Sequence, residues 1–192
     1  SRHIVGLLAV GWESDPPYYV MEYLENGSLA SHLSDGAFSP SEAVRIAKGV
    51  LHGLVHAHSR GILHCDLIPG NVLIDDDLSP RLCDFGQSRL SHEQDPALGT
   101  LYYMAPEQAD LGAHPDARWD VYALGALLYH LLTGVPPHRN NPSEKGLAAA
   151  ASLAERLALY RRLVAETQRG PDHRRIAGVD RRLAAIDARS LQ

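Results

Sequence analysis

The chain has 192 residues, of which 45% are hydrophobic and 21% charged, values typical of one globular domain. A formal net charge of −5 gives no basic footprint, so the composition argues against a nucleic-acid partner. The two cysteines, Cys65 and Cys83, are too few for a disulfide framework, which favours a reducing compartment and hence a cytoplasmic location. No signal-peptide pattern is present, and the apolar stretch 121–132 is too short to span a bilayer, so we expect no membrane contact in this segment.

The first third of the chain predicts two strands followed by two helices. Residues 4–11 and 17–23 form the strands, and the second is rich in Tyr and Val. A short helix opens at Ser28 or Ser31. A longer helix runs from Ser39 to about Ser59, because Pro at its first position and an early Glu favour a helix start. Its helically spaced apolar residues predict one buried stripe, made of Val44, Ala47, Leu51, Leu54 and Val55.

The remainder predicts a largely helical body. Two short strands, 72–74 and 81–83, flank an acidic turn, and residues 88–101 form a loop long enough to suggest function. Helices are expected at 116–132, 143–168 and 180–191. The longest of them should bury Leu153, Leu157, Tyr160 and Val164. This order of elements predicts an α+β fold with small strands in front of a helical body.

Three oxygen-bearing side chains occur in two short motifs. Asp66 and Asn71 belong to His-Cys-Asp-Leu-Ile-Pro-Gly-Asn at 64–71, and Asp84 opens Asp-Phe-Gly. A phosphoryl-transfer site needs a catalytic carboxylate and Mg²⁺ ligands, because the protein there positions groups and neutralises charge. An Asp five residues before an Asn would by itself usually mark a turn.

Five motifs in serial order resemble those of protein kinases. The two above are similar to the catalytic loop and the metal-binding loop. Residues 99–107, ending in Ala-Pro-Glu, look like the end of an activation segment. Residues 119–125 resemble the central helix of the large lobe, and 18–24 resemble the last small-lobe strand with the hinge. The chain is therefore similar to a bacterial-type Ser/Thr protein kinase catalytic domain over most of its length, except about 140–175.

This resemblance implies a protein-kinase-like α+β fold with a divided organisation. Residues 1–24 would hold residual small-lobe strands and the hinge, and 25–192 a C-terminal lobe that stops before its last helix. A glycine-rich phosphate loop and its partner strand Lys do not occur, since Lys48 and Lys145 lie elsewhere. The resemblance thus implies a fragment that is inactive or very weak alone.

The resemblance also assigns roles to individual residues. Asp66 would orient the substrate hydroxyl of a protein Ser or Thr, beside Thr100. Asn71 and Asp84 would hold the Mg²⁺ that bridges the phosphates of ATP. For the nucleoside, backbone groups of Glu22 and Leu24 would pair with adenine, Met21 and Leu73 would wall it, and Ser28 would meet the ribose. Structural roles fall to Asp120, which would receive catalytic-loop amides, and to a stack of Leu7, His64 and Phe85.

Two residues depart from the kinase pattern. Ile68 stands where Ser/Thr kinases have a Lys that meets the γ-phosphate, and it can donate no hydrogen bond. By analogy with removal of one preorganised donor, the cost is on the order of 10²–10³ in kcat. Cys65 stands where an Arg usually pairs with a phosphorylated activation loop, so control through the possible acceptors Ser88, Ser91 and Thr100 is disfavoured.

Other functions remain open at this stage. A pseudokinase, or a lone lobe that acts as a protein-binding scaffold, fits Ile68 and the missing strand Lys. A small-molecule kinase shares the Asp, Asn, Asp order, although the Ala-Pro-Glu segment favours the protein-kinase branch. His52 and His56 lie at helical spacing but lack a third metal ligand. Finally, an isolated two-stranded hairpin has open edges, so we expect it to support a homodimer.

Overall fold

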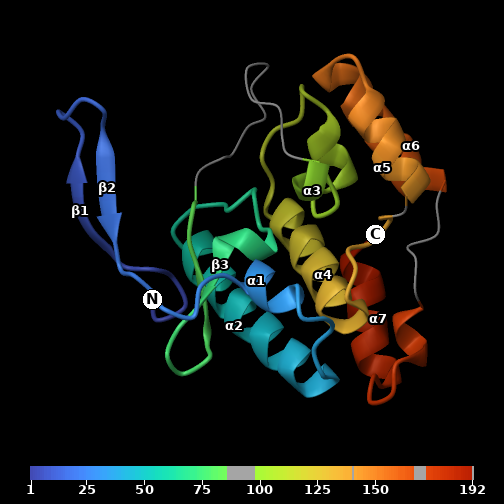
Figure 1. Cartoon of the computed structure of the whole chain (residues 1–192), viewed down its shortest axis with the longest axis horizontal. Helices are drawn as coiled ribbons and strands as arrows, with labels where there is room; N and C mark the ends of the chain where they lie inside the picture. Colours follow the sequence, from blue (N-terminus) through green and yellow to red (C-terminus); the bar gives the residue numbers. More distant parts are fainter. Residues whose placement is uncertain (86–97, 140, 167–171, 192) are drawn as a thin grey trace.

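The computed structural model describes residues 1–85, 98–139, 141–166 and 172–191, and it shows a helical body with a separate strand hairpin (Figure 1). The elements in chain order are β1 (Leu7–Gly11), β2 (Tyr18–Met21), α1 (Leu29–Leu33), α2 (Pro40–His58), β3 (Val72–Ile74), β4 (Pro80–Leu82), α3 (Leu98–Leu101), α4 (Ala117–Thr133), α5 (Asn141–Ala149), α6 (Leu153–Glu166) and α7 (Arg181–Ser190). Single 3₁₀ turns occur at Pro69–Asn71, Pro106–Ala109 and His173–Arg175. The expected α+β class is confirmed.

Helix α2 begins where the sequence predicts, but it buries a different face. Ser39 and Glu42 form a reciprocal capping box at its start. Of the expected stripe, Leu51 and Val55 are 43% and 58% exposed, so that part of the prediction is wrong. The buried face instead includes Gly53, where an added Cβ would lie 2.8 Å from Leu82 Cδ1 and 2.9 Å from the His3 carbonyl oxygen. The helix turns this narrow face inward because β4 and the N-terminal segment pass too close for a side chain.

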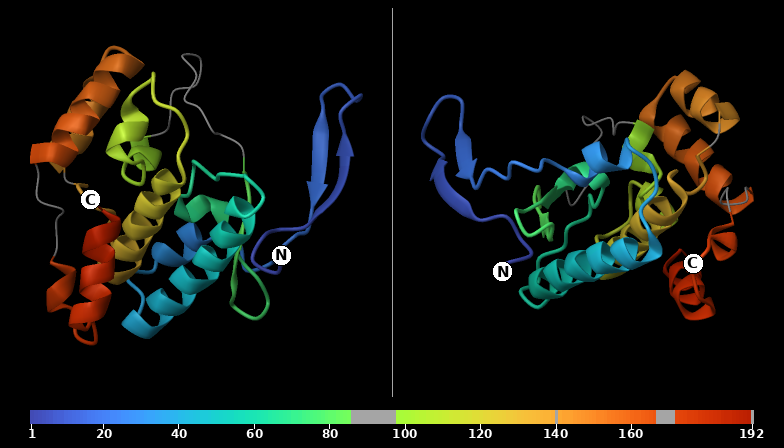
Figure 2. Two further views of the ribbon diagram at one scale, coloured as in Figure 1. Left: turned by 180° about the vertical axis from the view of Figure 1, so that it is seen from behind. Right: turned by 60° about the horizontal axis from the view of Figure 1, so that its bottom comes forward.

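Helix α4 is the centre of the body, and α2 and α7 pack on it (Figure 2). The Asp116 side chain caps its first turn by accepting from the Arg118 amide. Gly134 ends it in the left-handed conformation with φ 77°, a backbone geometry that favours glycine. Leu127 and Leu131 are fully buried in the cluster that α4 shares with α2. The predicted helix 116–132 is confirmed within one residue.

The predicted single helix 143–168 is two helices, α5 and α6, that lie side by side (Figure 1). Ser152 accepts a hydrogen bond from the Glu155 amide at 3.2 Å, and the Glu155 carboxylate accepts one from the Ala151 amide at 2.8 Å. This Ser-x-x-Glu pattern is typical of the start of a helix, and the prediction of one continuous helix overlooked it. Leu157 and Tyr160 are buried as expected. Residues 98–101 of the expected loop form α3, and the rest of that loop lies outside the described residues.

The β1–β2 hairpin stands apart from the helical body (Figures 1 and 2). The two strands pair antiparallel with an irregularity between Leu7 and Ala9. Their apolar side chains face solvent; Leu7 is 62%, Leu8 65% and Tyr19 54% exposed. Leu7 therefore does not join the stack expected with His64 and Phe85, because the hairpin holds it away from the core.

Because α2 and β4 approach closely at Gly53, alanine substitutions at two helical glycines should change the free energy of unfolding in opposite directions. Gly53→Ala should destabilise the chain by about 1–3 kcal/mol, because the new methyl meets a backbone oxygen that cannot move aside. Gly146→Ala should stabilise it by about 0.5–1 kcal/mol, because that helical position in α5 has nothing within 4 Å. Urea unfolding of both variants measures the difference; equal effects would contradict the packing described here.

Candidate active site

The β3–β4 pair brings two of the three predicted oxygen donors, Asn71 and Asp84, to one end of a short sheet. Val72 pairs with Leu82, and beyond this pair the Cys83 amide donates to the Asn71 carbonyl at 3.0 Å. Asp84 follows at once with φ 56°, in the left-handed region. The backbone therefore fixes Asn71 and Asp84 next to each other although thirteen positions separate them in the sequence.

The Asn71 side chain also hydrogen-bonds to Asp66, the remaining predicted oxygen donor. Its side-chain Nδ2 donates to the Asp66 carbonyl at 2.9 Å and to Asp66 Oδ2 at 3.0 Å. These bonds leave Asn71 Oδ1 as the amide atom suited to a cation. Burial raises the pKa of Asp66, the Asn71 hydrogen bond opposes this, and the charge of Asp84 raises it further. The three predicted oxygen donors thus form one electrostatically coupled cluster.

This donor set fits Mg²⁺ together with phosphate. Two carboxylates and one amide oxygen are hard ligands, and Mg²⁺ is commonly held by one or two carboxylates plus substrate phosphates. Among the residues that the structure describes, no group of three or more His, Cys, Asp or Glu side chains is placed to hold a metal ion alone.

The buried carboxylate of Asp120 holds the loop that carries Asp66. Its Oδ2 accepts from the His64 amide at 2.9 Å, and its Oδ1 from the Cys65 amide at 2.7 Å. His58 Nε2 lies 2.6 Å from the same Oδ2. The expected role of Asp120 is confirmed. The part played by His58 was missed, since nothing in the sequence relates a histidine on α2 to an aspartate 62 positions later.

Cys65 adopts φ 60° and is 6% exposed. Gln108, just after the Ala-Pro-Glu motif, donates from Nε2 to the Cys65 carbonyl at 2.7 Å. Burial, followed by the charges of Asp120 and Asp66, raises the pKa of the Cys65 thiol to about 12. The side chain at this position is therefore an uncharged, packed thiol that cannot act as a counter-charge for a phosphate.

His64 and Phe85 stack, with ring centroids 4.6 Å apart. Burial lowers the pKa of His64, which favours the neutral ring. Two of the three expected stack members therefore meet, and they tie the catalytic loop to the segment after Asp84.

Ile68 belongs to the loop that carries Asp66, and Thr100 lies in α3. Ile68 is half-buried and packs against an apolar cluster that includes Leu101 and Met104. Thr100 lies in α3, where its carbonyl accepts from the Tyr103 amide at 3.1 Å. Within the described parts of the chain no hydrogen bond joins Thr100 to Asp66, so its place beside the acceptor hydroxyl stays a prediction.

The predicted nucleoside residues lie where the hairpin meets the body. Ser28 and Leu73 pair in an isolated antiparallel bridge. The Glu22 amide donates to the Gly6 carbonyl at 3.0 Å, and the Leu24 carbonyl accepts from the Gly27 amide at 3.2 Å. These bonds use the Glu22 amide and the Leu24 carbonyl, so the pairing of the other backbone groups of these two residues with adenine stays a prediction.

Met21 is 38% exposed at the end of β2. A second contact of this hairpin was not expected from the sequence: the Tyr19 hydroxyl donates to Asp84 Oδ1 at 3.1 Å. That hydrogen bond, more than the charge of Asp84, raises the pKa of Tyr19. The hairpin therefore reaches the metal-ligand end of the site.

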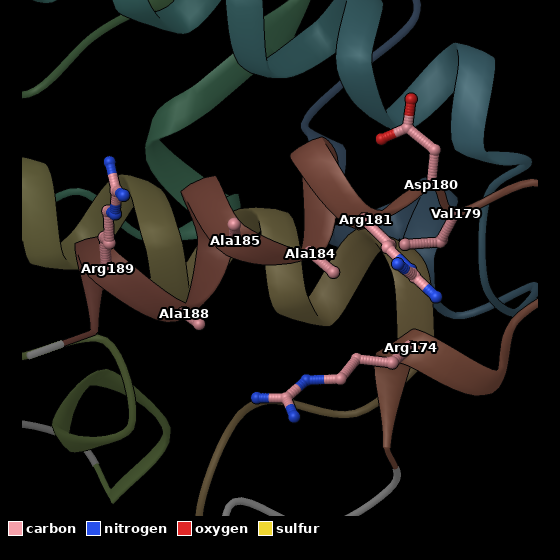
Figure 3. A pocket seen from close by; sticks show the side chains of 8 residues that line it. All are labelled: Arg174, Val179, Asp180, Arg181, Ala184, Ala185, Ala188 and Arg189. Carbon is pink, nitrogen blue, oxygen red and sulfur yellow. The ribbon is translucent and has the colours of Figure 1, made fainter.

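A cavity of about 550 Å³ lies on α7, away from this cluster (Figure 3). It is lined by Arg174, Val179, Asp180, Arg181, Ala184, Ala185, Ala188 and Arg189. None of the predicted site residues lines it. The candidate active site is therefore defined by convergent side chains and not by this hollow.

The family model of the protein kinase domain matches residues 1–174. The chain belongs to this family. The kinase chain is 41% identical over 144 residues to the DNA damage-responsive serine/threonine-protein kinase RqkA of Deinococcus radiodurans, an alignment covering 70% of the chain and 21% of that protein.

Two further relatives are bacterial serine/threonine-protein kinases. PknL of Mycobacterium tuberculosis is 36% identical over 175 residues, covering 88% of the chain and 41% of that protein. PrkC of Bacillus subtilis is 36% identical over 142 residues, covering 70% of the chain and 22% of that protein. The expected bacterial Ser/Thr-kinase resemblance is confirmed. The kinase chain spans between 21% and 41% of the length of these three relatives.

The helices of the described ranges include none that is both long and apolar enough to cross a bilayer.

The coupled cluster predicts opposite pKa shifts at Asp66. Asp84→Asn should lower the pKa of Asp66, because a like charge is removed. Asn71→Ala should raise it, because a hydrogen bond to the carboxylate is lost. NMR titration of the Asp66 carboxyl carbon measures both, with exposed Asp76→Asn as the control.

The same shift gives Asp66 its own contribution to the pH dependence of stability. Since folding raises the pKa of Asp66, the contribution of Asp66 to stability is full below its unfolded pKa and is lost as pH rises through its folded pKa.

In the NMR titration, shifts of the Asp66 pKa that have the same sign in the Asp84 and Asn71 variants would contradict the shared site.

Proposed function

We propose that this chain carries the catalytic lobe of a serine/threonine protein kinase that transfers the γ-phosphoryl group of ATP to protein Ser or Thr hydroxyls. The observation that supports it most is the Asn71 side chain bonded to Asp66, with the charge of Asp84 acting on the same carboxylate. A carboxylate base beside two metal ligands is the arrangement that phosphoryl transfer requires.

In this proposal each residue has one task. The oxygen of the substrate hydroxyl forms a bond to the γ-phosphorus of ATP, and Asp66 accepts the proton of that hydroxyl. The bond between the γ-phosphorus and the β-phosphate oxygen breaks, which releases ADP. Asn71 and Asp84 hold Mg²⁺, which neutralises charge on the phosphates. Thr100 lies beside the acceptor.

The nucleoside end follows the same logic. Adenine pairs with the Glu22 carbonyl and the Leu24 amide, Met21 and Leu73 wall it, and Ser28 meets the ribose. We place the reaction in the cytoplasm, which suits two free and buried cysteine thiols.

Thermal unfolding with and without Mg-ATP tests the proposal. A ligand at 100 times its Kd should stabilise the chain by about 2.7 kcal/mol. Asp84→Asn should remove the Mg²⁺-dependent part of this gain, whereas Asp76→Asn in the exposed turn should keep it. No stabilisation at millimolar Mg-ATP would contradict the proposal.

Ile68 should limit the rate more than it limits binding. Ile68→Lys should raise phosphoryl transfer to a protein substrate by up to about 10²-fold, because it restores a cationic donor near the γ-phosphate. The affinity for Mg-ATP should change little. Ile62→Lys, at an exposed position, is the matched control; an equal gain there would refute a specific role.

A scaffold function is the second candidate, and two observations favour it. Ile68 packs into the apolar cluster, and the Tyr19 hydroxyl occupies Asp84 Oδ1. A scaffold of this kind would bind protein without binding Mg-ATP, so the thermal measurement separates the two functions.

We also propose that the β1–β2 hairpin supports a homodimer. It exposes apolar side chains on a two-stranded sheet with open edges, including Leu8 and Val20. Light scattering should show mass rising with concentration, and Val20→Lys should abolish the rise. Val55→Lys, at an exposed α2 position, should not; a monomer at every concentration would contradict the dimer.

A further inference from the structure

Arg81 lies on β4, three positions before the proposed metal ligand Asp84, and it has no role in the proposed reaction. Its neighbours Pro80 and Leu82 are buried in the body. Arg81 itself pairs across the sheet with Leu73, the residue expected to wall adenine. Because directly opposed residues share a face of the sheet, Arg81 lies on the nucleotide side of β4.

The Arg81 guanidinium bridges two carboxylates from different parts of the chain. Its Nε donates to Asp75 Oδ2 at 3.0 Å, and its Nη1 donates to Glu22 Oε2 at 3.0 Å. The side chains of Arg81 and Asp75 are 26% and 11% exposed, so the Asp75 contact is partly shielded from water, whereas the Glu22 side chain is 42% exposed. The rigid fork of arginine suits such a two-sided bridge, which a lysine could not copy with the same geometry.

The Asp75 end of the bridge is fixed by its own turn. Asp75 Oδ1 accepts from the Asp77 amide at 3.1 Å and from the Ser79 amide at 2.8 Å. Burial opposes ionisation of Asp75, but the Ser79 amide and Arg81 outweigh it and lower its pKa. Arg81 is therefore held from one side by a rigid, charged acceptor.

The Glu22 end is fixed to the base of the hairpin. Glu22 Oε2 also accepts from the Gly6 amide at 3.0 Å, while the Glu22 amide donates to the Gly6 carbonyl. An added Cβ at Gly6 would lie 3.0 Å from the Glu22 carboxyl carbon, so the two residues approach closely. The bridge thus joins β4 directly to the residue whose carbonyl would receive adenine.

We propose that Arg81 is a positioning residue that sets the distance between the adenine-binding backbone at Glu22 and the Mg²⁺ ligand Asp84. This inference rests on the proposed function. One ATP molecule must contact both the adenine-binding backbone at Glu22 and the Mg²⁺ ligand Asp84, which we call the two half-sites. Each half-site strengthens binding at the other only when the distance between them matches the length of ATP. In this proposal Arg81 acts through its hydrogen bond to Glu22.

Three ligands separate this role from a local structural one. Calorimetric titration of Arg81→Met should give affinities for adenosine and for Mg-tripolyphosphate within about twofold of the wild type, because each ligand uses one half-site. The affinity for Mg-ATP should fall roughly tenfold, because the half-sites no longer match. Arg162→Met breaks an exposed ion pair with Glu166 on α6 and should change none of the three.

A second variant approaches the bridge from the hinge. Glu22→Leu removes the side-chain oxygens that accept from Arg81 and should also weaken Mg-ATP binding, while Arg81 keeps its bond to Asp75, so the test survives if Arg81→Met does not fold. The backbone bonds of His3 and Val5 to Leu82 remain in both variants. The double variant should bind no more weakly than the weaker single variant.

The outcomes are distinguishable. If the wild type binds Mg-ATP and both bridge variants bind it equally well, the inference is wrong and the proposed function stands. An equal loss for adenosine or Mg-tripolyphosphate alone also overturns the inference, since the effect would then be local. A wild type that does not bind Mg-ATP overturns both.

Discussion

The site depends on one buried carboxylate. Asp120 is fully buried, and an ionised group there is tolerable only when donors surround it. The amides of His64 and Cys65 and the ring of His58 supply this environment. These hydrogen bonds hold the loop 64–71 with Cys65 in a left-handed conformation, which fixes the direction of the chain immediately before Asp66. Helix α4, α2 and the catalytic loop thereby meet at a single side chain.

From that anchor, short-range contacts assemble the rest of the site. Asn71 ties the loop to the β3–β4 sheet, and the sheet places Asp84 beside it. Burial and, to a smaller extent, the charge of Asp84 raise the pKa of Asp66, and a divalent cation beside the two carboxylates would offset that charge. Arg81 then connects the same sheet to the hinge. Loop, sheet and hinge form one connected frame although their residues are far apart in sequence.

The sequence predicted the parts of this frame that short motifs encode. The helix start at Ser39, the strands around the acidic turn and the central helix α4 all follow local rules of capping and periodicity. The kinase-like motifs also singled out Asp66, Asn71 and Asp84, whose coupling the structure displays.

The errors have tertiary causes. The buried face of α2 was misassigned because apolar periodicity does not reveal that β4 approaches at Gly53. The break before α6 was missed because the predicted apolar stripe, from Leu153 to Val164, lies entirely within α6 and does not reveal where that helix begins. The contacts of His58 with Asp120, of Tyr19 with Asp84 and of Arg81 with Glu22 were beyond prediction, since each joins residues about 60 positions apart. Such pairs leave no local pattern in a single sequence.

The most direct test of the central geometry replaces Mg²⁺ by Mn²⁺ in the presence of ATP and follows NMR line broadening. If the three oxygen donors surround one cation, the signals of the Asn71 side-chain amide and of the backbone at positions 66 and 84 should broaden together at substoichiometric Mn²⁺. If any of the three stays sharp while signals elsewhere broaden, the cation binds at another place and the account of the site is wrong.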